Sequence, residues 1–361
     1  MIKLNINLGE RSYPIYITTD YGSLGKTISS ARLTGKTVLV TDTNVDRFQA
    51  EECIEALNTD GFNVEKYVIP AGEKNKTLDT VRDIYKYLIR LKLDRNATLI
   101  ALGGGVVGDI TGFAAATFLR GINFVQVPTT LLAQADSSVG GKVGVDLDGS
   151  KNIIGSFYQP RLVYINVNTL KTLPKRELQS GLAEVIKHGV IRDPDFLDYI
   201  DYNIKKIFNF EPDALQFMTK TNCRIKGGVV EQDEKESDLR AILNFGHTIG
   251  HAIETVQNFQ LLHGECVALG MVAAFRMAVY LGMADKEDLK RLTDILEKVG
   301  LPTALKGIDV DKVYNQMFYD KKVKGSKLVF VLPRKIGEVL QLTIEDEELV
   351  KRVIGELGKD I

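Results

Sequence analysis

Residues 98–109, TLIALGGGVVGD, combine a short apolar run with a glycine-rich turn. The run TLIAL (98–102) suits a parallel strand that is buried on both faces, and the helix-compatible segment ITGFAAATF follows at 110–118. A strand, a tight glycine turn and a helix in this order are typical of a phosphate-binding loop, because a helix N-terminus offers N–H donors and the positive end of its dipole. The stretch therefore predicts an α/β fold built from strand–helix units.

Other apolar runs alternate with helical stretches up to about residue 175. The β-type runs lie at 36–42 (KTVLVTD), 64–69 (VEKYVI), 122–127 (INFVQV) and 161–167 (RLVYINV). Residues 45–57 and 77–91 have the helical period. On the first of these helices, five apolar side chains approximate one face: Val45, Phe48, Cys53, Ile54 and Leu57. This alternation predicts a doubly wound, Rossmann-like α/β sheet.

The strand signal nearly vanishes after residue 176, where one helical pattern follows another as far as Gly300. Pro174 interrupts the chain at this change, and residues 326–342 have the pattern of a terminal hairpin. A chain of 361 residues also exceeds what one hydrophobic core usually holds. We therefore expect an α/β domain at residues 1–175 and a mostly α-helical domain at 176–361.

The overall composition is that of an ordinary globular protein, with 44% hydrophobic and 26% charged residues and a formal charge of −1. This balance gives no electrostatic reason to expect nucleic acid or a membrane surface as a partner. Three cysteines without CxxC spacing (Cys53, Cys223 and Cys266) suggest reduced thiols. No apolar run reaches 18 residues and the N-terminal stretch lacks a signal-peptide layout, so the cytoplasm is the expected compartment.

The glycine turn contains a G-x-G-x-x-G pattern in Gly103, Gly105 and Gly108, which is a nucleotide-binding signature only in the right context. The context is irregular, because an ordinary Rossmann turn follows the first strand and precedes an acidic residue by about 20 positions. Here the turn follows roughly the third or fourth strand, and the acid that ends a strand, Asp42, lies upstream. The alternative is a tight structural turn. The loop PAGEKNKT (70–77) is either a second nucleotide loop or a helix N-terminus with solvated charges.

Three of the four histidines lie within residues 247–263, HTIGHAIETVQNFQLLH. His247 and His251 are four residues apart and share a helical face, with Glu254 three residues further on, and His263 begins the next helix. A catalytic zinc takes three protein ligands and keeps one position open. Three imidazoles, or two imidazoles and a carboxylate, would both serve, and spacing does not choose between them. The alternative is ordinary hydrogen-bonded helix histidines. Cys266 fits a small buried residue better than a ligand.

Several basic and amide side chains stand next to glycines or helix ends, and each alone is most often a solvated surface group. They are Arg120, Lys142, Lys151, Asn152, Lys226, Arg240 and Asn244. Together they would suit a substrate that carries both a carboxylate and a phosphate.

Six blocks in unbroken order give the chain a specific resemblance to a known family. The blocks are ALGGGVVGDITGFAAATFLRGI, QVPTTLLAQADSSVGGKVGVD, KNIIGSFYQP, SGLAEVIKHG, ILNFGHTIGHAIE and HGECVALGM. From about residue 36 to 335 the chain resembles the 3-dehydroquinate synthase family of the sugar-phosphate cyclases. The resemblance implies a carbon–oxygen lyase of the shikimate pathway, which leads to chorismate and the aromatic amino acids.

The resemblance also implies roles for particular residues. It makes Glu184, His247 and His263 the ligands of Zn²⁺, or of Co²⁺ in its place, and leaves Glu254 to structure. NAD would contact Asp42, Thr43, Asn44, Glu73, Lys76, Gly104, Gly105, Val106, Val107, Gly108, Asp109, Thr129, Thr130, Asp136, Lys142, Lys151, Thr169, Leu170, Lys171 and Thr172. Substrate contacts would come from Asp136, Lys142, Asn152, Lys187, Lys226, Arg240, Asn244 and His251. Arg120 would reach the phosphate site of a neighbouring subunit in a homodimer, and Lys321 or Lys322 would complete the phosphate cluster.

The implied reaction converts 3-deoxy-D-arabino-heptulosonate 7-phosphate to 3-dehydroquinate. NAD would oxidise C5, the C6 proton and the C7 phosphate would leave, the hydride would return, and an aldol closure would follow. Among rivals, a glycerol-dehydrogenase-like enzyme needs no carboxylate and phosphate clamps. A 2-deoxy-scyllo-inosose synthase has an acidic residue where this chain has Asn244. A non-catalytic relative would not need the full set of metal-binding and substrate-binding residues that this chain keeps. His188 and Cys266 depart from the usual family residues, Tyr and Ala, without replacing a site residue.

Overall fold

The computed structural model describes residues 1–148, 150–319 and 327–358. Its internal contacts group the chain into two units, residues 1–174 with 210–231 and residues 175–209 with 232–361. The chain therefore returns to the first unit through helix α8 (Pro212–Gln232) after it has begun the second. Within the described residues, no helix is both long and apolar enough to span a bilayer.

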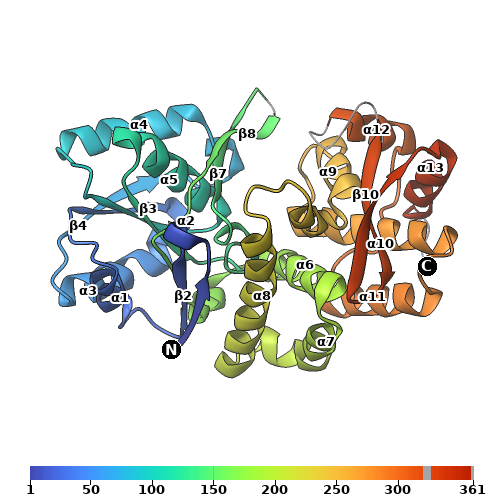
Figure 1. Ribbon diagram of the computed structural model, residues 1–361, viewed down its shortest axis with the longest axis horizontal. Helices are drawn as coiled ribbons and strands as arrows, with labels where there is room; N and C mark the ends of the chain where they lie inside the picture. The colour runs from blue at the N-terminus through green and yellow to red at the C-terminus, as the bar shows by residue number, and fades with distance from the viewer. Residues whose placement is uncertain (149, 320–326, 359–361) are drawn as a thin grey trace. The chain divides into compact units, whose positions relative to one another are not determined.

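The first unit is built on a seven-stranded sheet with the order β1-β2-β9-β6-β5-β3-β4 (Figure 1). All neighbours are parallel except β1 and β2. The strands are β1 (Ile2–Ile6), β2 (Tyr13–Thr18), β3 (Thr37–Asp42), β4 (Val64–Ile69), β5 (Thr98–Gly103), β6 (Asn123–Pro128) and β9 (Leu162–Asn166), with β7 (Lys142–Leu147) and β8 (Ser150–Phe157) forming a separate hairpin. The predicted doubly wound sheet is confirmed.

Both faces of the sheet are covered, which explains why its strands are continuous apolar runs. On β3, Val38 and Val40 pack on one side and Leu39 on the other, because successive side chains of a strand point to opposite faces. One face carries α4 (Leu78–Arg90) and α5 (Gly105–Thr117), and the other carries α1 (Leu24–Ser30) and α3 (Glu51–Thr59) (Figure 1).

The prediction of a regular helix over 45–57 is wrong in its first turns. A short α-helical turn, α2 (Thr43–Val45), leads into a π-helical segment, Asp46–Ala50, before α3 begins. A π-helix has a wider turn than an α-helix, so the residues before α3 fall out of phase with those after it. Phe48, expected to face inward, is 60% exposed, whereas Cys53 and Leu57 are fully buried as expected. Even on a regular helix, at about 100° per residue, Phe48 would lie opposite Leu57, so these side chains do not share one face.

The second unit is mostly helical, as predicted. Its elements are α6 (Lys175–Arg192), α7 (Pro194–Phe208), α9 (His247–Val256), α10 (His263–Tyr280), α11 (Lys286–Val299), α12 (Val310–Gln316), the hairpin β10 (Leu328–Lys335) and β11 (Glu338–Ile344), and α13 (Glu347–Glu356). Helix α10 is buried along almost its whole length and packs against α6, α9, α11, α13 and β10. The core of this unit is therefore arranged around α10.

Candidate active site

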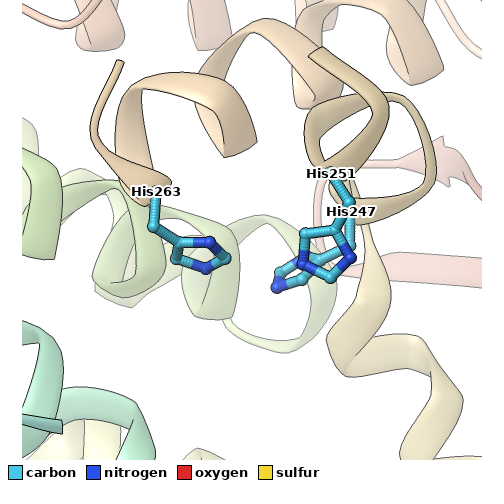
Figure 2. A group of neighbouring side chains, drawn as sticks. All are labelled: His247, His251 and His263. Atoms are coloured by element: carbon cyan, nitrogen blue, oxygen red, sulfur yellow. The ribbon is translucent and has the colours of Figure 1, made fainter. Parts of the chain in front are cut away.

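Three imidazoles from two helices face one another in the second unit. His247 and His251 lie one turn apart on α9, and His263 is the first residue of α10. Figure 2 shows the ring of His263 pointing across toward the other two. One ring nitrogen from each lies within 4.8 Å of the others. The helix spacing of the sequence and the loop between α9 and α10 together bring the histidine cluster into one place.

A buried carboxylate from a third helix completes this cluster. Glu184 on α6 is fully buried, and its Oε1 lies 3.5 Å from Nε2 of His247 and 3.3 Å from Nε2 of His263. Neither carboxylate oxygen receives a well-formed hydrogen bond among the described residues, and Lys187, one turn further along α6, is its ion-pair partner. Two imidazole nitrogens that converge on a buried carboxylate form a donor set that suits Zn²⁺.

The electrostatics of the cluster favour a charged carboxylate. Burial opposes ionisation of Glu184, but the Lys187 ammonium and His263 outweigh it and hold the pKa of the carboxyl well below its usual range. Burial likewise opposes protonation of His263, yet the nearby carboxylates of Glu184 and Glu254 raise its pKa to about 9. The carboxylate of Glu184 is therefore ionised at neutral pH, as a metal ligand must be.

A close helix crossing fixes where α10 begins relative to α6. The amide of Gly264 donates to Oγ of Ser180 at 3.0 Å, and a Cβ at position 264 would lie 1.9 Å from the Ser180 carbonyl oxygen. Only glycine allows this approach. Because His263 precedes Gly264 and Glu184 lies one turn beyond Ser180, the crossing sets the separation of the two side chains.

Arg240 lies in a short 3-10 helix, Leu239–Asn244, that follows a loop organised by one carboxylate. Oxygens of Asp233 accept from the Ser237 amide and hydroxyl, from the Asp238 amide and from the Arg240 amide, at 2.8–3.0 Å. Burial alone would raise the pKa of Asp233, but these donors hold it well below its usual range. Arg240 itself is buried and donates to the Glu234 carbonyl, while Asn244 donates to Glu236 at 2.8 Å. No sequence pattern singles out Asp233, because a carboxylate that caps a loop has no periodic signature.

Five segments expected to contact NAD share one edge of the parallel sheet in the first unit. Each lies at or within a few residues of a strand's carboxyl end: Asp42–Asn44 at β3, Glu73–Lys76 after β4, Gly104–Asp109 after β5, Thr129–Thr130 after β6 and Thr169–Thr172 after β9. The carboxyl ends of parallel strands meet at one edge, so the fold brings these segments to it. From β3 onward the strand order is 2-1-3-4-5, with its switch point between β3 and β5. The glycine turn therefore stands beside the switch point, although it does not follow the first strand.

Two of these segments are joined to the β7–β8 hairpin through Lys76. Its Nζ lies 2.6 Å from Asp109 and 2.5 Å from the amide oxygen of Asn152, and its carbonyl accepts from the Asp146 amide at 2.9 Å. Burial raises the pKa of Asp109 to about 6, against the opposing effect of the Lys76 ammonium. Lys151 approaches Glu73 at 3.8 Å. The hairpin thus carries the expected substrate residue Asn152 to the sheet edge.

The remaining expected site residues are distributed over both units. Asp136 accepts from Nζ of Lys226 on α8 at 2.6 Å, and Lys142 begins β7. Arg120 follows the last turn of α5, a helix of 13 residues or about 20 Å, and so lies away from the glycine turn at its start. Lys321 and Lys322 lie outside the described residues. The three cysteines are free and buried, as expected.

Two solved structures that are similar to this chain are cyclases with a nicotinamide cofactor and a metal ion bound. A 2-deoxy-scyllo-inosose synthase complexed with carbaglucose-6-phosphate, NAD⁺ and Co²⁺ has a TM-score of 0.89 at 26% identity, over 98% of this chain and all of the other. A 2-epi-5-epi-valiolone synthase from Streptomyces hygroscopicus subsp. jinggangensis, with NAD⁺ and Zn²⁺ bound, has a TM-score of 0.88 at 25% identity, over 97% and 98%. Fold and site together thus define a member of the sugar-phosphate cyclase superfamily.

Sequence comparison narrows this class. Residues 66–180 match the family described as 3-dehydroquinate synthase N-terminal, and residues 181–323 match 3-dehydroquinate synthase C-terminal. A 3-dehydroquinate synthase of Acetivibrio thermocellus is 73% identical over 360 residues, which cover 99% of this chain and all of the relative. The chain belongs to the 3-dehydroquinate synthase family.

Proposed function

We propose that this chain converts 3-deoxy-D-arabino-heptulosonate 7-phosphate to 3-dehydroquinate and phosphate, as an enzyme of the shikimate pathway. The observation that carries the proposal is the convergence of His247 Nε2 and His263 Nε2 on the buried carboxylate of Glu184, in a chain 73% identical to a 3-dehydroquinate synthase. The other residues assigned to the reaction are spread over the chain, which we divide into an NAD-binding domain at 1–175 and a metal- and substrate-binding domain at 176–361.

Glu184, His247 and His263 would hold the metal. Of the two similar cyclase structures, one contains Co²⁺ and the other Zn²⁺. The ion, when bound, supplies Lewis acidity at the C4 and C5 oxygens of the substrate. Lys187 balances the charge of Glu184 from the same helix. Its ammonium is assigned to a substrate contact, because it has three N–H donors and needs only some of them for Glu184. His251, one turn beyond His247, is assigned to the substrate phosphate and not to the metal.

The carboxyl edge of the first unit's sheet would hold NAD, which supplies a reversible hydride acceptor for C5. Support for this assignment comes from the switch point between β3 and β5, where open α/β sheets bind ligands, and from the N-terminus of α5, which directs N–H donors at the glycine turn. Asp42 at the end of β3 suits the ribose hydroxyls. The NAD-contacting set otherwise remains the one that the family resemblance implies.

The substrate would be held at its two charged ends. Lys226 and Arg240 are assigned to the carboxylate, and Lys142, Asn152, Asn244 and His251 to the phosphate. Holding both ends fixes the reacting carbons between them, and the phosphate itself is then placed to take the C6 proton before it leaves. Arg120, at the far end of α5, is assigned to the phosphate site of a second subunit in a homodimer, and the cytoplasm is the proposed compartment of this reduced-thiol protein.

One assay tests this function. The enzyme is supplied with Zn²⁺, a catalytic amount of NAD and the heptulosonate phosphate, and inorganic phosphate, 3-dehydroquinate and NADH are followed together. We expect equal amounts of phosphate and 3-dehydroquinate, with no accumulation of NADH over many turnovers. Glucose 6-phosphate, which lacks the carboxylate, serves as the comparison substrate. NADH formed in step with product, or equal turnover of glucose 6-phosphate, would contradict the proposal.

A further inference from the structure

Glu254 lies beside His263 at the ring nitrogen that does not face Glu184, and it has no role in the reaction described above. It stands on α9, two turns beyond His247, and it is 6% exposed. Its Oε2 lies 3.5 Å from Nδ1 of His263, across the turn that joins α9 to α10. A buried carboxylate is costly unless it has a specific partner, so this contact with a metal-site imidazole calls for an explanation.

The two imidazoles that face Glu184 are held in the same way. His263 directs Nε2 at Glu184 and Nδ1 at Glu254. His247 also directs Nε2 at Glu184, and its Nδ1 lies 3.1 Å from the Phe245 carbonyl oxygen. An imidazole whose Nδ1–H is taken by an acceptor keeps its lone pair on Nε2, which is the nitrogen that a metal needs. Each ring therefore has an acceptor on its outer side and the cluster on its inner side.

We propose that Glu254 is a positioning residue that fixes the tautomer and orientation of His263 and thereby sets the affinity of the site for its metal. The inference rests on the proposed metal site. A carboxylate at this position does more than a carbonyl, because its charge also increases the basicity of the imidazole that it binds. The contact joins α9 to α10, so it also holds the two helices that supply the histidines at a fixed separation.

The test compares Glu254→Gln and Glu254→Ala with wild type in Zn²⁺ competition against a chromophoric chelator. The alanine variant should bind Zn²⁺ about 10- to 100-fold more weakly, which is the usual effect of removing such a partner. The glutamine variant should fall between, because its amide oxygen still accepts from Nδ1–H but carries no charge. The visible spectrum of the Co²⁺-loaded protein should change in the alanine variant, since the donor geometry at His263 changes.

Two further variants make the outcome specific. Glu356→Gln removes a carboxylate that contacts Arg276 and Tyr280 at the other end of α10, and its Zn²⁺ affinity should stay within twofold of wild type. His247→Ala should lose the metal. If both Glu254 variants bind Zn²⁺ within twofold of wild type while His247→Ala loses the metal, the positioning role of Glu254 is overturned and the metal site stands. Metal retained by His247→Ala would overturn the proposed site and the role of Glu254 with it.

Discussion

Replacing Gly264 by alanine should separate α6 from α10 and weaken metal binding. The added Cβ would lie 1.9 Å from the Ser180 carbonyl oxygen, about 1.1 Å short of the 3.0 Å below which Cβ atoms are essentially never found. The obstacle is backbone, so it cannot rotate away, and the two helices must move apart. Overpacking of this kind costs about 1–3 kcal/mol, and loss of the Gly264–Ser180 hydrogen bond adds about 1 kcal/mol.

The same movement displaces His263 from Glu184 by a large part of an ångström, whereas metal–ligand distances hold to about 0.2 Å. Denaturant unfolding of the metal-free protein should therefore show a loss of about 2–4 kcal/mol, and Zn²⁺ competition at least a tenfold weaker site. Gly355→Ala on α13 is the matched control, because its Cβ would meet only Val310 Cγ2, at an ordinary 3.6 Å. That variant should be unchanged or more stable by up to about 1 kcal/mol. A Gly264→Ala protein with wild-type stability and Zn²⁺ affinity would refute the argument.

Three other predictions concern Arg240 as the proposed binder of the substrate carboxylate, the loop that precedes it, and the carboxyl edge of the sheet. Arg240→Ala should lower kcat/KM for the natural substrate about ten- to a hundredfold, but inhibition by an analogue without the carboxylate much less, and equal losses would refute the assignment. Asp233→Asn should destabilise the protein at pH 7 by about 1–3 kcal/mol. Because the native pKa of Asp233 is lowered, its contribution to the free energy of unfolding is present above about pH 4 and is lost as the pH falls below that. Urea unfolding should therefore show the difference in stability between mutant and wild type shrinking in acid. A difference that stays constant with pH would contradict the role of Asp233 as the loop's cap. Asp109 has its native pKa raised to about 6, so it favours the fold below pH 4 and this contribution disappears as the pH rises through 6. Asp109→Asn should flatten that part of the stability profile, and an unchanged slope would refute the shift.

Sequence patterns predicted the fold well wherever the signal is local and repetitive. Strands such as β3 and β5 are buried on both faces and read as apolar runs, and α6, α9 and α10 keep the helical period. The prediction of a regular helix over 45–57 is wrong at Asp46–Ala50, because a π-helical turn leaves no mark in the composition. Spacing also gave no sign that α8 rejoins the first unit, since its partners, Asn222 with the Ala135 carbonyl among them, are distant in sequence.

In the candidate site, too, the residues with a local sequence pattern could be predicted and those brought together by tertiary packing could not. The pair His247 and His251 follows from helical geometry, and His263 from a helix start nearby, but nothing local connects Glu184 to them. That carboxylate was implied only by the family resemblance, and the structure brings it within 3.5 Å of both His247 and His263. Contacts made by tertiary packing, such as Glu254 with His263 or Asp233 with its loop, leave no periodic pattern in the sequence, so they could not be predicted from it.

The loop that ends at Arg240 draws its order from Asp233, whose four accepted hydrogen bonds come from the backbone amides of Ser237, Asp238 and Arg240 and from one serine hydroxyl. The guanidinium of Arg240 is not among those donors, but it donates to the Glu234 carbonyl of the same loop. A substitution at position 240 therefore removes one bond to the loop and leaves the four bonds to Asp233 in place. With Arg240 in its proposed role at the substrate carboxylate, position 240 is a starting point for redesigning substrate choice, because most of the bonds that order the loop do not depend on that side chain.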